Sequence, residues 1–517
     1  MTDPSPADAR SERRAARRSK RAESPLLRIP FRAVTNPWPP LEVVRPEQLD
    51  QLHDASLRIL EDIGLNFMDA ETLSIWEKAG ARVDHAKQHA WLDRGMVMEA
   101  VARAPQSFTW RARNPAHDVA IGGNHIAFAP QGGVAYVTSL DKGRRSGNLT
   151  DYENFLKINQ MAGVIHFAGE QLVAPREVPA SLRHLARLPR AIRFSDKALM
   201  EAAHGREITT DAVNLAELVF GPQDGGSPII GGIINASSPL RYDERMLGGL
   251  ITYARAGQVT IITPFILAGA MSPISIASAI AQQNAEALAG IALAQLVRPG
   301  APVIYGGFTT NVDMRSGSPA FGTPEGAWAL AVGAQLARRY KLPYRGSGSL
   351  NTSKVADAQS ANETAWTMWP AVMAHTNFIM HSVGWLEGGL TVSYEKVILD
   401  LENLALFQHF LAGFEISDQT LALDMIAAVG PGGHHFGTEH TQARFSTEFF
   451  ETFVADRSGF ENWVAAGRHD AAARAAALWP ELIASYEAPP LEAGIAEAVA
   501  DYTARREREL EGKSLYD

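Results

Sequence analysis

The sequence predicts an α/β protein whose main domain is a (β/α)8 TIM barrel. Between residues 151 and 452, apolar runs that end in small or polar residues alternate with longer stretches of helical periodicity. Strands that are apolar throughout and alternate with helices form parallel sheets covered on both faces. The runs repeat seven times, with an eighth candidate, and no glycine-rich dinucleotide fingerprint follows the early ones. Both observations favour a barrel over an open, doubly wound sheet.

The apolar runs mark the strands, and the periodic stretches between them mark the helices. The predicted strands are His166–Val173, Ala191–Phe194, Pro228–Asn235, Val259–Pro264, Pro302–Phe308, Pro343–Ser349 and Asn377–Val383, with the eighth candidate at Val429–Phe436. The predicted helices are Asp243–Ala256, Pro273–Val297, Pro324–Tyr340, Asp357–Ala374 and Tyr394–Leu411. In such barrels the chemistry takes place on the loops that follow the strands.

Three further segments flank the predicted barrel. Residues 1–40 form a basic, proline-containing lead-in without helical or strand periodicity. Residues 41–150 predict an α+β extension with two helices, the first ending at Gly64, followed by short strands at Phe108–Arg111, Val119–Ile121 and Ile126–Phe128. Residues 453–517 are rich in Ala and Glu and predict helices that serve as a lid or as an assembly element.

Composition excludes several classes of protein. The chain has 517 residues, of which 46% are hydrophobic and 20% charged, and this supports a large folded core. The net charge of −9 argues against nucleic-acid or anionic-membrane binding. The absence of cysteine excludes disulfides, thiolate nucleophiles and cysteine-ligated metals. No apolar run is long enough to span a membrane and no apolar signal core is present, so we expect a cytoplasmic protein whose basic run from Arg10 to Arg21 is a solvated tail.

Familiar catalytic motifs are missing from the sequence. It has no phosphate-binding glycine loop, no His-Glu-x-x-His helix and no nucleophile elbow. Successive predicted strands instead end in Gly, hydroxyl, amide and aromatic residues, at 235–239, 305–310 and 344–349. Glycine lets a flat ligand approach the backbone, and hydroxyls and amides bond to its rim. Any one of these loops is compatible with ordinary loop composition, but their recurrence at successive strand ends favours a site.

Two more segments carry candidate functional side chains. Residues 432–440 contain His434, His435, Glu439 and His440, which could bind a metal. The flanking glycines indicate a loop, not a helix face that fixes ligand geometry, so we favour a hydrogen-bonding histidine beside a ligand and no tightly bound metal. Residues 381–390 place an aromatic ring and a carboxylate directly after a predicted strand, although core packing and solvation would explain both.

Several runs together resemble the trimethylamine methyltransferase family. They are Trp385-Leu386-Glu387-Gly388-Gly389-Leu390-Thr391-Val392-Ser393-Tyr394-Glu395-Lys396, Ser353-Lys354-Val355-Ala356-Asp357-Ala358-Gln359, the glycine–histidine loop at 432–440, the layout from Arg45 to Asn114 and the arginine-rich leader. The resemblance covers essentially the whole chain. It implies a TIM-barrel enzyme that passes a methyl group from a methylamine to the cobalt of a separate corrinoid protein, and a homo-oligomer.

One departure from the family changes the expected substrate. The trimethylamine enzymes carry pyrrolysine in the segment that resembles residues 347–359, and this chain has only standard residues there. It therefore resembles the pyrrolysine-free branch, which acts on quaternary amines such as glycine betaine. Because no corrinoid-binding domain is evident, we expect the methylcobalamin/cob(I)alamin to be carried by the partner and not by this chain.

A quaternary amine needs a cation site and no acid or base, because the departing amine is neutral. Aromatic faces bind such cations, and a betaine carboxylate would need Arg345 or backbone N–H donors. The predicted substrate-binding residues are Gln171, Asn235, Tyr305, Phe308, Arg345, His381, Trp385, Glu387, His435 and Phe436. The predicted cofactor-contacting residues are Ser237, Gly306, Gly346, Ser347, Gly433 and His434.

Two other functions stay open from the sequence alone. One is a TIM-barrel lyase or hydrolase that uses Glu387 and His435 as acid and base. The other is a small-molecule binding protein that keeps the barrel without turnover.

Overall fold

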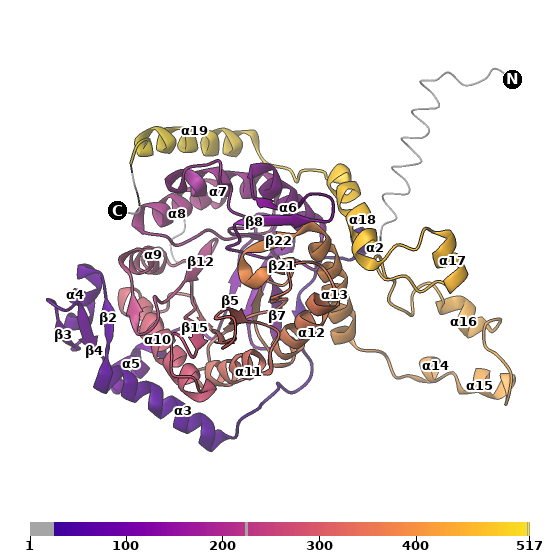
Figure 1. The fold of residues 1–517 in the computed structure, drawn as a ribbon, viewed down its shortest axis with the longest axis horizontal. Coiled ribbons are helices and arrows are strands. Elements are labelled where there is room, and N and C mark those ends of the chain that lie inside the picture. The colour runs from indigo at the N-terminus through magenta and orange to yellow at the C-terminus, as the bar shows by residue number, and fades with distance from the viewer. Residues whose placement is uncertain (1–24, 223–225, 514, 516–517) are drawn as a thin grey trace.

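Helices surround a mostly parallel β-sheet in the computed structural model, which describes residues 25–222, 226–513 and 515 (Figure 1). The predicted mixed α/β class is confirmed. The basic run from Arg10 to Arg21 lies outside the described residues. None of the helices in those ranges combines the length and the apolar character needed to cross a membrane.

The central sheet has seven strands in the order β1-β7-β20-β19-β16-β14-β12. Its neighbours pair in parallel, except that β1 is antiparallel to β7. A second, two-stranded parallel sheet joins β10 to β11. The strands are β1 (Val34–Thr35), β7 (His125–Phe128), β10 (Phe167–Gly169), β11 (Ala198–Leu199), β12 (Gly231–Ile234), β14 (Val259–Ile262), β16 (Val303–Gly306), β19 (Tyr344–Ser347) and β20 (Phe378–Met380).

Most of the predicted strands are confirmed, and two are wrong. Residues 191–194 are the last turn of helix α7 (Arg183–Phe194), and the real strand, β11, follows it. Residues 429–436 contain the end of helix α15 (Leu423–Val429) and then turns. A short apolar run fits a buried helix as well as a strand, which is why the pattern was misleading in both places.

The strand β7 also belongs to this sheet, because it pairs in parallel with β20. The sequence grouped it with the extension before residue 151. The parallel strands therefore begin at residue 125.

The predicted helices are confirmed and cover the sheet. They are α9 (Glu244–Arg255), α10 (Ile276–Val297), α11 (Pro324–Arg339), α12 (Ala358–Met373) and α13 (Tyr394–Ala412), joined by α6 (Leu149–Met161), α7 and α8 (Arg206–Phe220). Asp243, Ser275, Thr323, Asp357 and Ser393 cap five of these helices through side-chain oxygens that accept backbone N–H groups. These caps lie at the ends of the loops that follow the strands, so they fix where those loops end.

A hairpin packs against the amino ends of the strands. It consists of β5 (Ser107–Trp110) and β6 (Val119–Gly122), which pair antiparallel. The Trp110 ring lies 5.1 Å from the ring of Phe167 and 6.4 Å from that of Phe378, centroid to centroid. Phe167 and Phe378 are the first residues of β10 and β20. Aromatic packing therefore fills the amino end of the sheet and leaves the carboxyl ends as the place for a site.

The N-terminal extension packs beside α10. It contains α3 (Pro46–Arg58), α4 (Ala70–Lys78) and α5 (Arg94–Val101), and a four-stranded sheet of β13 (Arg241–Tyr242), β2 (Leu65–Phe67), β4 (His89–Trp91) and β3 (Arg82–Asp84). A π-helical turn, η1 (Ile59–Ile63), continues α3 as far as Gly64, whose φ of 79° favours glycine, so the predicted stop is confirmed. Contacts of α10 with α3 and α5 attach the extension to the rest of the protein.

Residues 413–452 form a projecting segment that we call the arm (Figure 1). It contains α14 (Asp418–Leu421), α15 and α16 (Glu439–Arg444). After it come α17 (Phe460–Ala465), α18 (Ala471–Ser485) and α19 (Ala493–Leu510), so the end of the chain is helical as predicted. Helix α18 packs on α13 and α6, and α19 packs on α7 and α8.

Candidate functional site

Two small sheets extend the carboxyl ends of the parallel strands. One contains β15 (Phe265–Ala268), β17 (Phe308–Val312) and β18 (Pro319–Ala320). The other contains β21 (Trp385–Leu386), β22 (Thr391–Ser393), β8 (Tyr136–Ser139) and β9 (Gly143–Ser146). Because these sheets follow β14, β16 and β20, they hold the loop side chains above the strand ends.

Four rings from these loops form an aromatic cluster of Phe308, Phe321, His381 and Trp385. The Trp385 ring centroid lies 4.9 Å from that of Phe321, 5.3 Å from that of His381 and 6.4 Å from that of Phe308. Phe308 and Phe321 stack at 5.8 Å. These separations are those of aromatic pairs in contact. Trp385 is only 3% exposed, and Phe308 is half-buried, so Phe308 is the more exposed ring of the two.

Gly389 backs the Trp385 ring. A Cβ atom placed on Gly389 would lie 2.4 Å from Cζ2 of Trp385, and the φ of Gly389 is 94°. Both the contact and the backbone conformation exclude a larger side chain. Gly389 thus sets the position of the indole.

Arg345 lies beside the aromatic cluster in the interior of the sheet. Its Cζ atom is 5.2 Å from the Phe308 ring centroid, and its side chain is among the largest fully buried ones. One Nη donates to the carbonyl of Gly307 at 3.2 Å and the other contacts the sulfur of Met380 at 3.4 Å. Its Nε is buried and has no partner among the described residues. Burial lowers the pKa of Arg345 to about 10, so the guanidinium is still charged at neutral pH and keeps an unused donor.

Carboxylates lie near this cation. Glu170 follows β10 and accepts a hydrogen bond from Nε2 of Gln171 at 3.2 Å. Burial, followed by the nearby charge of Glu201, raises the pKa of Glu170 to about 7, while Arg187 and Arg345 oppose the rise. Glu201 itself forms a buried ion pair with Arg187. The ionisation of Glu170 therefore changes the charge beside Arg345 near neutral pH.

His381 is held as a neutral ring. Its Nδ1 lies 3.1 Å from Oγ of Ser347. Burial, and next the charge of Arg345, keep the pKa of His381 well below its usual range. The ring therefore adds an aromatic face to the cluster without adding a competing positive charge.

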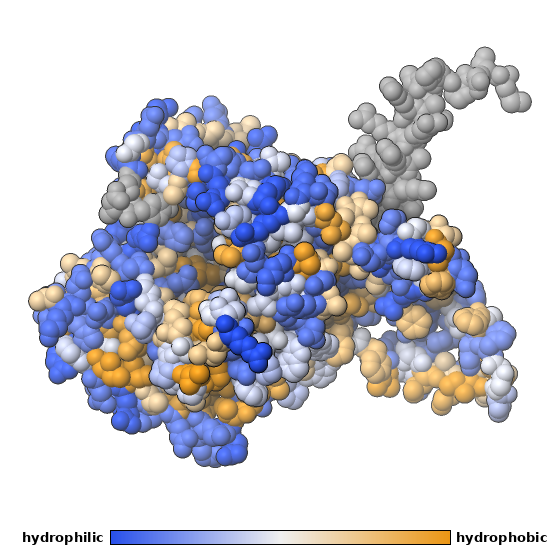
Figure 2. Space-filling model, viewed as in Figure 1, coloured by the Kyte–Doolittle hydropathy of each residue, from blue (hydrophilic) through white to orange (hydrophobic). Residues whose placement is uncertain are grey.

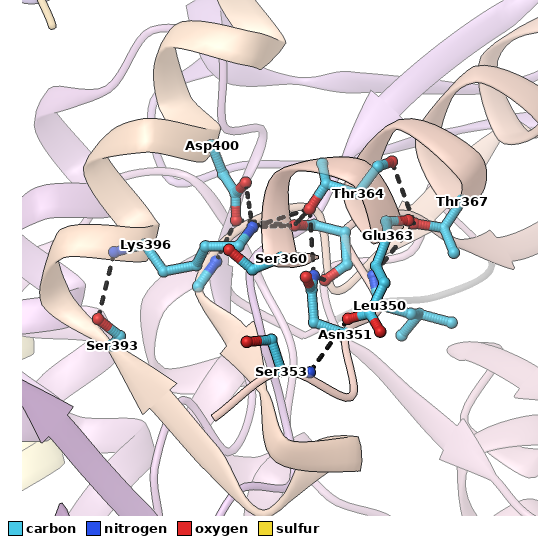
Figure 3. Close-up of polar contacts among 12 residues, drawn as sticks. Leu350, Asn351, Ser353, Ser360, Glu363, Thr364, Thr367, Ser393, Lys396 and Asp400 are labelled. Carbon is cyan, nitrogen blue, oxygen red and sulfur yellow. Dashed lines mark hydrogen bonds and ion pairs between the residues drawn. The ribbon is translucent and has the colours of Figure 1, made fainter. Parts of the chain in front are cut away.

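A buried network centred on Lys396 holds the loops after β19 and β20 (Figure 3). The Lys396 ammonium donates to Oγ of Ser349 at 2.9 Å and to Oγ1 of Thr364 at 2.8 Å, and forms an ion pair with Asp400. The Asp400 carboxylate accepts from Oγ of Ser349 at 2.7 Å and from the backbone N–H of Gly384 at 2.8 Å. One helix, α13, thus fixes the loop after β20, which carries His381 and Trp385, and the neighbouring loop after β19.

The two loops also bond directly to each other. The N–H of Glu387 donates to the carbonyl of Ser353 at 2.8 Å, and the N–H of Gly388 donates to that of Asn351 at 2.8 Å. Glu363 accepts from the N–H groups of Thr352 at 2.8 Å and Ser353 at 3.1 Å. The segment after β19 is therefore a rigid support for the indole.

The structure brings five of the predicted site residues together: Phe308, Arg345, Ser347, His381 and Trp385. Gln171 lies next to Glu170, whose charge acts on Arg345.

The other predicted residues lie elsewhere. The hydroxyl of Tyr305 donates to Oδ1 of Asn284 on α10 at 2.9 Å, so its ring faces the helices. Asn235 is exposed, and Ser237 donates to Asp243 at 2.6 Å, the cap of α9.

Glu387 points toward the outer surface, where it pairs with Nε of Arg144 at 3.0 Å. Gly433, His434, His435 and Phe436 lie on the arm, where Phe436 is 82% exposed. The structure thus separates the two groups that an acid–base lyase would need to combine.

Two of the predicted cofactor-contacting glycines, Gly306 and Gly346, lie closely packed inside the protein. A Cβ atom on Gly306 would lie 2.2 Å from Oγ1 of Thr263, and one on Gly346 would lie 3.0 Å from Cδ1 of Leu330. Protein atoms already fill the space that these glycines allow. Within the described ranges, no group of three or more His, Asp or Glu side chains is placed to hold a metal ion.

Sequence reasoning missed Phe321, Glu170 and the Lys396–Asp400 pair. Phe321 lies in a loop between β17 and α11, where no strand pattern marks it. Glu170 interrupts the predicted apolar run at 166–173, directly after β10, and this was the available signal. Lys396 and Asp400 are four residues apart on one face of α13, a spacing that usually indicates an exposed pair.

Comparison with known proteins identifies the family of the chain. The family model described as trimethylamine methyltransferase (MTTB) matches residues 10–511 of the chain. The chain belongs to this family.

Among its relatives, the glycine betaine methyltransferase of Desulfitobacterium hafniense (strain Y51) is 38% identical over 474 residues, which cover 91% of this chain and 98% of the relative. The trimethylamine methyltransferase MttB of Desulfitobacterium hafniense (strain DSM 10664 / DCB-2) is 30% identical, covering 87% of this chain and 91% of that one. A solved structure, the monomethylamine methyltransferase MtmB of Methanosarcina barkeri, aligns over 96% of this chain and 93% of its own at 10% identity, with a TM-score of 0.46. Membership of this family makes the protein a methyltransferase, as the sequence predicted.

Proposed function

We propose that this protein transfers a methyl group from a quaternary amine of the glycine betaine type to the Co(I) of a separate corrinoid protein. The single observation that carries this proposal is the aromatic cluster of Phe308, Phe321, His381 and Trp385 beside the unused Nε donor of Arg345. The similarity to a glycine betaine methyltransferase supports it.

The two parts of the site match the two ends of a betaine. Aromatic faces attract a quaternary ammonium by about 0.5–2 kcal/mol each. An arginine with a free, buried N–H group binds a carboxylate, because a charge-assisted hydrogen bond gains strength in a buried site. The neutral His381 keeps the cation site free of a repelling charge.

The reaction needs no acid or base from the protein. The acceptor cobalt attacks the methyl carbon in line, the carbon–cobalt bond forms as the carbon–nitrogen bond breaks, and the electron pair stays on nitrogen. The amine leaves as a neutral tertiary amine, so no proton moves in the step. The residues of this chain hold the cation, align one methyl group and exclude water.

We also propose that the two sheets close into the (β/α)8 barrel that the sequence predicts. Two backbone hydrogen bonds support this: the N–H of His166 donates to the carbonyl of Phe128 at 2.9 Å, and that of Glu201 to Gly231 at 3.1 Å. The first bond connects β7 to the start of β10, and the second connects the end of β11 to β12. The site then lies at the mouth of the barrel, where the corrinoid protein can approach it.

The experiment that tests the function is a panel of quaternary amines with free cob(I)alamin, followed by the absorbance of methylcobalamin. We expect a betaine to be demethylated and trimethylamine to be left unchanged, because residues 347–359 are all standard. Comparable turnover of trimethylamine would overturn the substrate assignment.

A second measurement tests how the cofactor is handled. We expect the purified protein to contain no tightly bound corrinoid, because the sequence has no recognisable corrinoid-binding domain. Stoichiometric cobalt in the isolated chain would contradict a carrier-borne corrinoid.

A further inference from the structure

The arm exposes an apolar surface that the rest of its own chain leaves uncovered. Its helices α14, α15 and α16 bury none of their residues. The exposed fractions of its large apolar residues run from 48% to 86%, and these residues are Phe414, Ile416, Leu421, Leu423, Ile426, Phe436, Phe445 and Phe449. Figure 2 shows apolar residues gathered along one edge of the arm.

This surface is too large for a protein that works as a single chain. Four of the eight side chains are phenylalanines, and an aromatic residue contributes about 150–250 Å² when fully exposed. The eight residues together offer on the order of 1,000 Å², whereas each partner of a standard interface buries about 800 Å². Apolar patches of that size mark interaction sites.

The arm is fixed at its base. Where the chain returns, the carboxylate of Glu402 on α13 accepts hydrogen bonds from the N–H groups of Phe453 at 2.6 Å, Val454 at 2.6 Å and Ala455 at 2.9 Å. The Phe450 ring lies 5.7 Å from that of His409 on the same helix. The arm therefore presents its apolar surface from a firm attachment.

A second exposed apolar surface lies on the body near this base. We call it the aromatic face; it consists of Trp366 and Trp369 on α12 and Leu406 and Phe410 on α13, which are 40–48% exposed. The Trp369 ring contacts that of Phe410 at 5.4 Å. The Trp38 ring also contacts that of Phe410 at 4.9 Å, but all four side chains of the face keep a large exposed fraction.

We propose that the arm of one copy packs on the aromatic face of a second copy, and that the second arm does the same in return. Both surfaces occur once per chain, so a two-fold arrangement pairs every arm with a face and closes the assembly. The corrinoid protein is a poorer occupant, because it must leave after each methyl transfer, whereas an apolar surface of this size needs permanent cover. The arm projects from the body on the side of α12 and α13 (Figure 1).

The first test is the mass of the assembly. The arm variant is Leu423→Glu/Phe445→Glu, and the matched control is Ile274→Glu/Met314→Glu; the four residues are 68%, 69%, 68% and 67% exposed. Sedimentation equilibrium at micromolar concentration should give an even number of chains for the unmodified protein and for the control. The arm variant should dissociate at least tenfold more readily toward single chains, with an unchanged circular dichroism spectrum.

Two outcomes of this test overturn the proposal. One is a single-chain mass for the unmodified protein at every concentration. The other is an arm variant that associates as tightly as the control, which would place the contact on another surface. The assay measures mass alone, so it is independent of the proposed methyl transfer.

The second test uses the absence of cysteine in the chain. Single variants Phe445→Cys on the arm and Trp366→Cys on the aromatic face are mixed, dissociated, reassembled and treated with a bis-maleimide. We expect a cross-linked species containing one chain of each variant, and a much lower yield when Ile274→Cys replaces Phe445→Cys. Equal yields in the two mixtures would contradict packing of the arm on the aromatic face.

Discussion

The aromatic cluster and the arm look alike in the sequence and differ completely in the structure. Both are loops in which glycine alternates with aromatic and histidine residues, at 381–390 and at 432–440. Trp385 is 3% exposed, whereas Phe436 is 82% exposed. The difference comes from neighbours distant in sequence. Asp400 and Ser353 bond to the first loop, whereas the side chains of His440 and Gln442 bond to carbonyl groups within the arm. An aromatic, glycine-rich loop indicates a small-molecule site only when a buried scaffold fixes it.

The largest expected effect comes from removing that scaffold. Lys396→Met leaves the carboxylate of Asp400 buried without its cation, and should lower the free energy of unfolding by about 3–5 kcal/mol. The double variant Lys396→Met/Asp400→Leu should recover most of the loss. Arg444→Met breaks the exposed pair of Arg444 with Glu448 on the arm, and should change stability by less than about 1 kcal/mol.

Urea unfolding of these variants measures both effects. If Lys396→Met were no more destabilising than Arg444→Met, the buried network would not be what distinguishes the two loops.

The next largest effect is expected on the pH dependence of stability, through the buried carboxyl of Glu170 near the cluster. Because the pKa of Glu170 is raised from 4.5 to about 7, the folded protein holds a proton there that the unfolded chain has lost. The stability from this group is fully present below pH 4.5 and is lost as the pH rises to about 7. Glu170→Gln should therefore gain about 1–3 kcal/mol over the unmodified protein between pH 5 and pH 8.

Thermal melting at the two pH values measures this gain. Glu415→Gln on the arm is the matched control for the same change of carboxylate to amide at an exposed position. If the pH dependence of stability were the same in Glu170→Gln as in the unmodified protein, another group would be its cause.

The cation site itself is tested by Trp385→Ala. If the indole faces the quaternary ammonium, binding or methyl transfer should weaken about ten- to thirtyfold, equivalent to ~1.4–2 kcal/mol. Trp385→Phe should recover part of that loss. Because Trp385 is buried, its Ala variant should also lose about 3–5 kcal/mol of stability, so kinetics are measured on the folded fraction.

Phe436→Ala is the comparison on the arm, and it should leave the affinity for the amine nearly unchanged. A destabilised Trp385→Ala variant with normal affinity would remove Trp385 from the site.

The smallest effect comes from a pair of glycines. Gly389 and Gly432 both have positive φ, 94° and 81°, so an alanine at either strains the backbone by about 1–2 kcal/mol. Only at Gly389 does the new Cβ also meet the Trp385 ring, whereas nothing lies within 4 Å at Gly432. We expect Gly389→Ala to raise KM about threefold beyond any effect of Gly432→Ala. Equal KM values would show that the position of the indole does not matter.

The alternation of strands and helices was predictable because buried parallel strands are apolar throughout, as at 259–262 and 303–306. β11 was missed because it has two residues, too few to leave a pattern. The helix before it was misread because its apolar end fits either structure. In the candidate site, Phe308, Arg345 and Trp385 lie in or shortly after predicted strands and could be found, but Phe321 reaches the cluster only through tertiary packing.

The attachment of the arm has a consequence for the evolution of the chain. Its first end leaves α13 at Ala412, and its second end returns to Glu402 of the same helix, about three helical turns away. A segment whose two ends meet on one rigid element can be shortened, lengthened or replaced as a module without disturbing the neighbouring helices. Relatives of this enzyme are therefore free to exchange the segment, and to acquire different quaternary structures, while their catalytic chemistry stays the same.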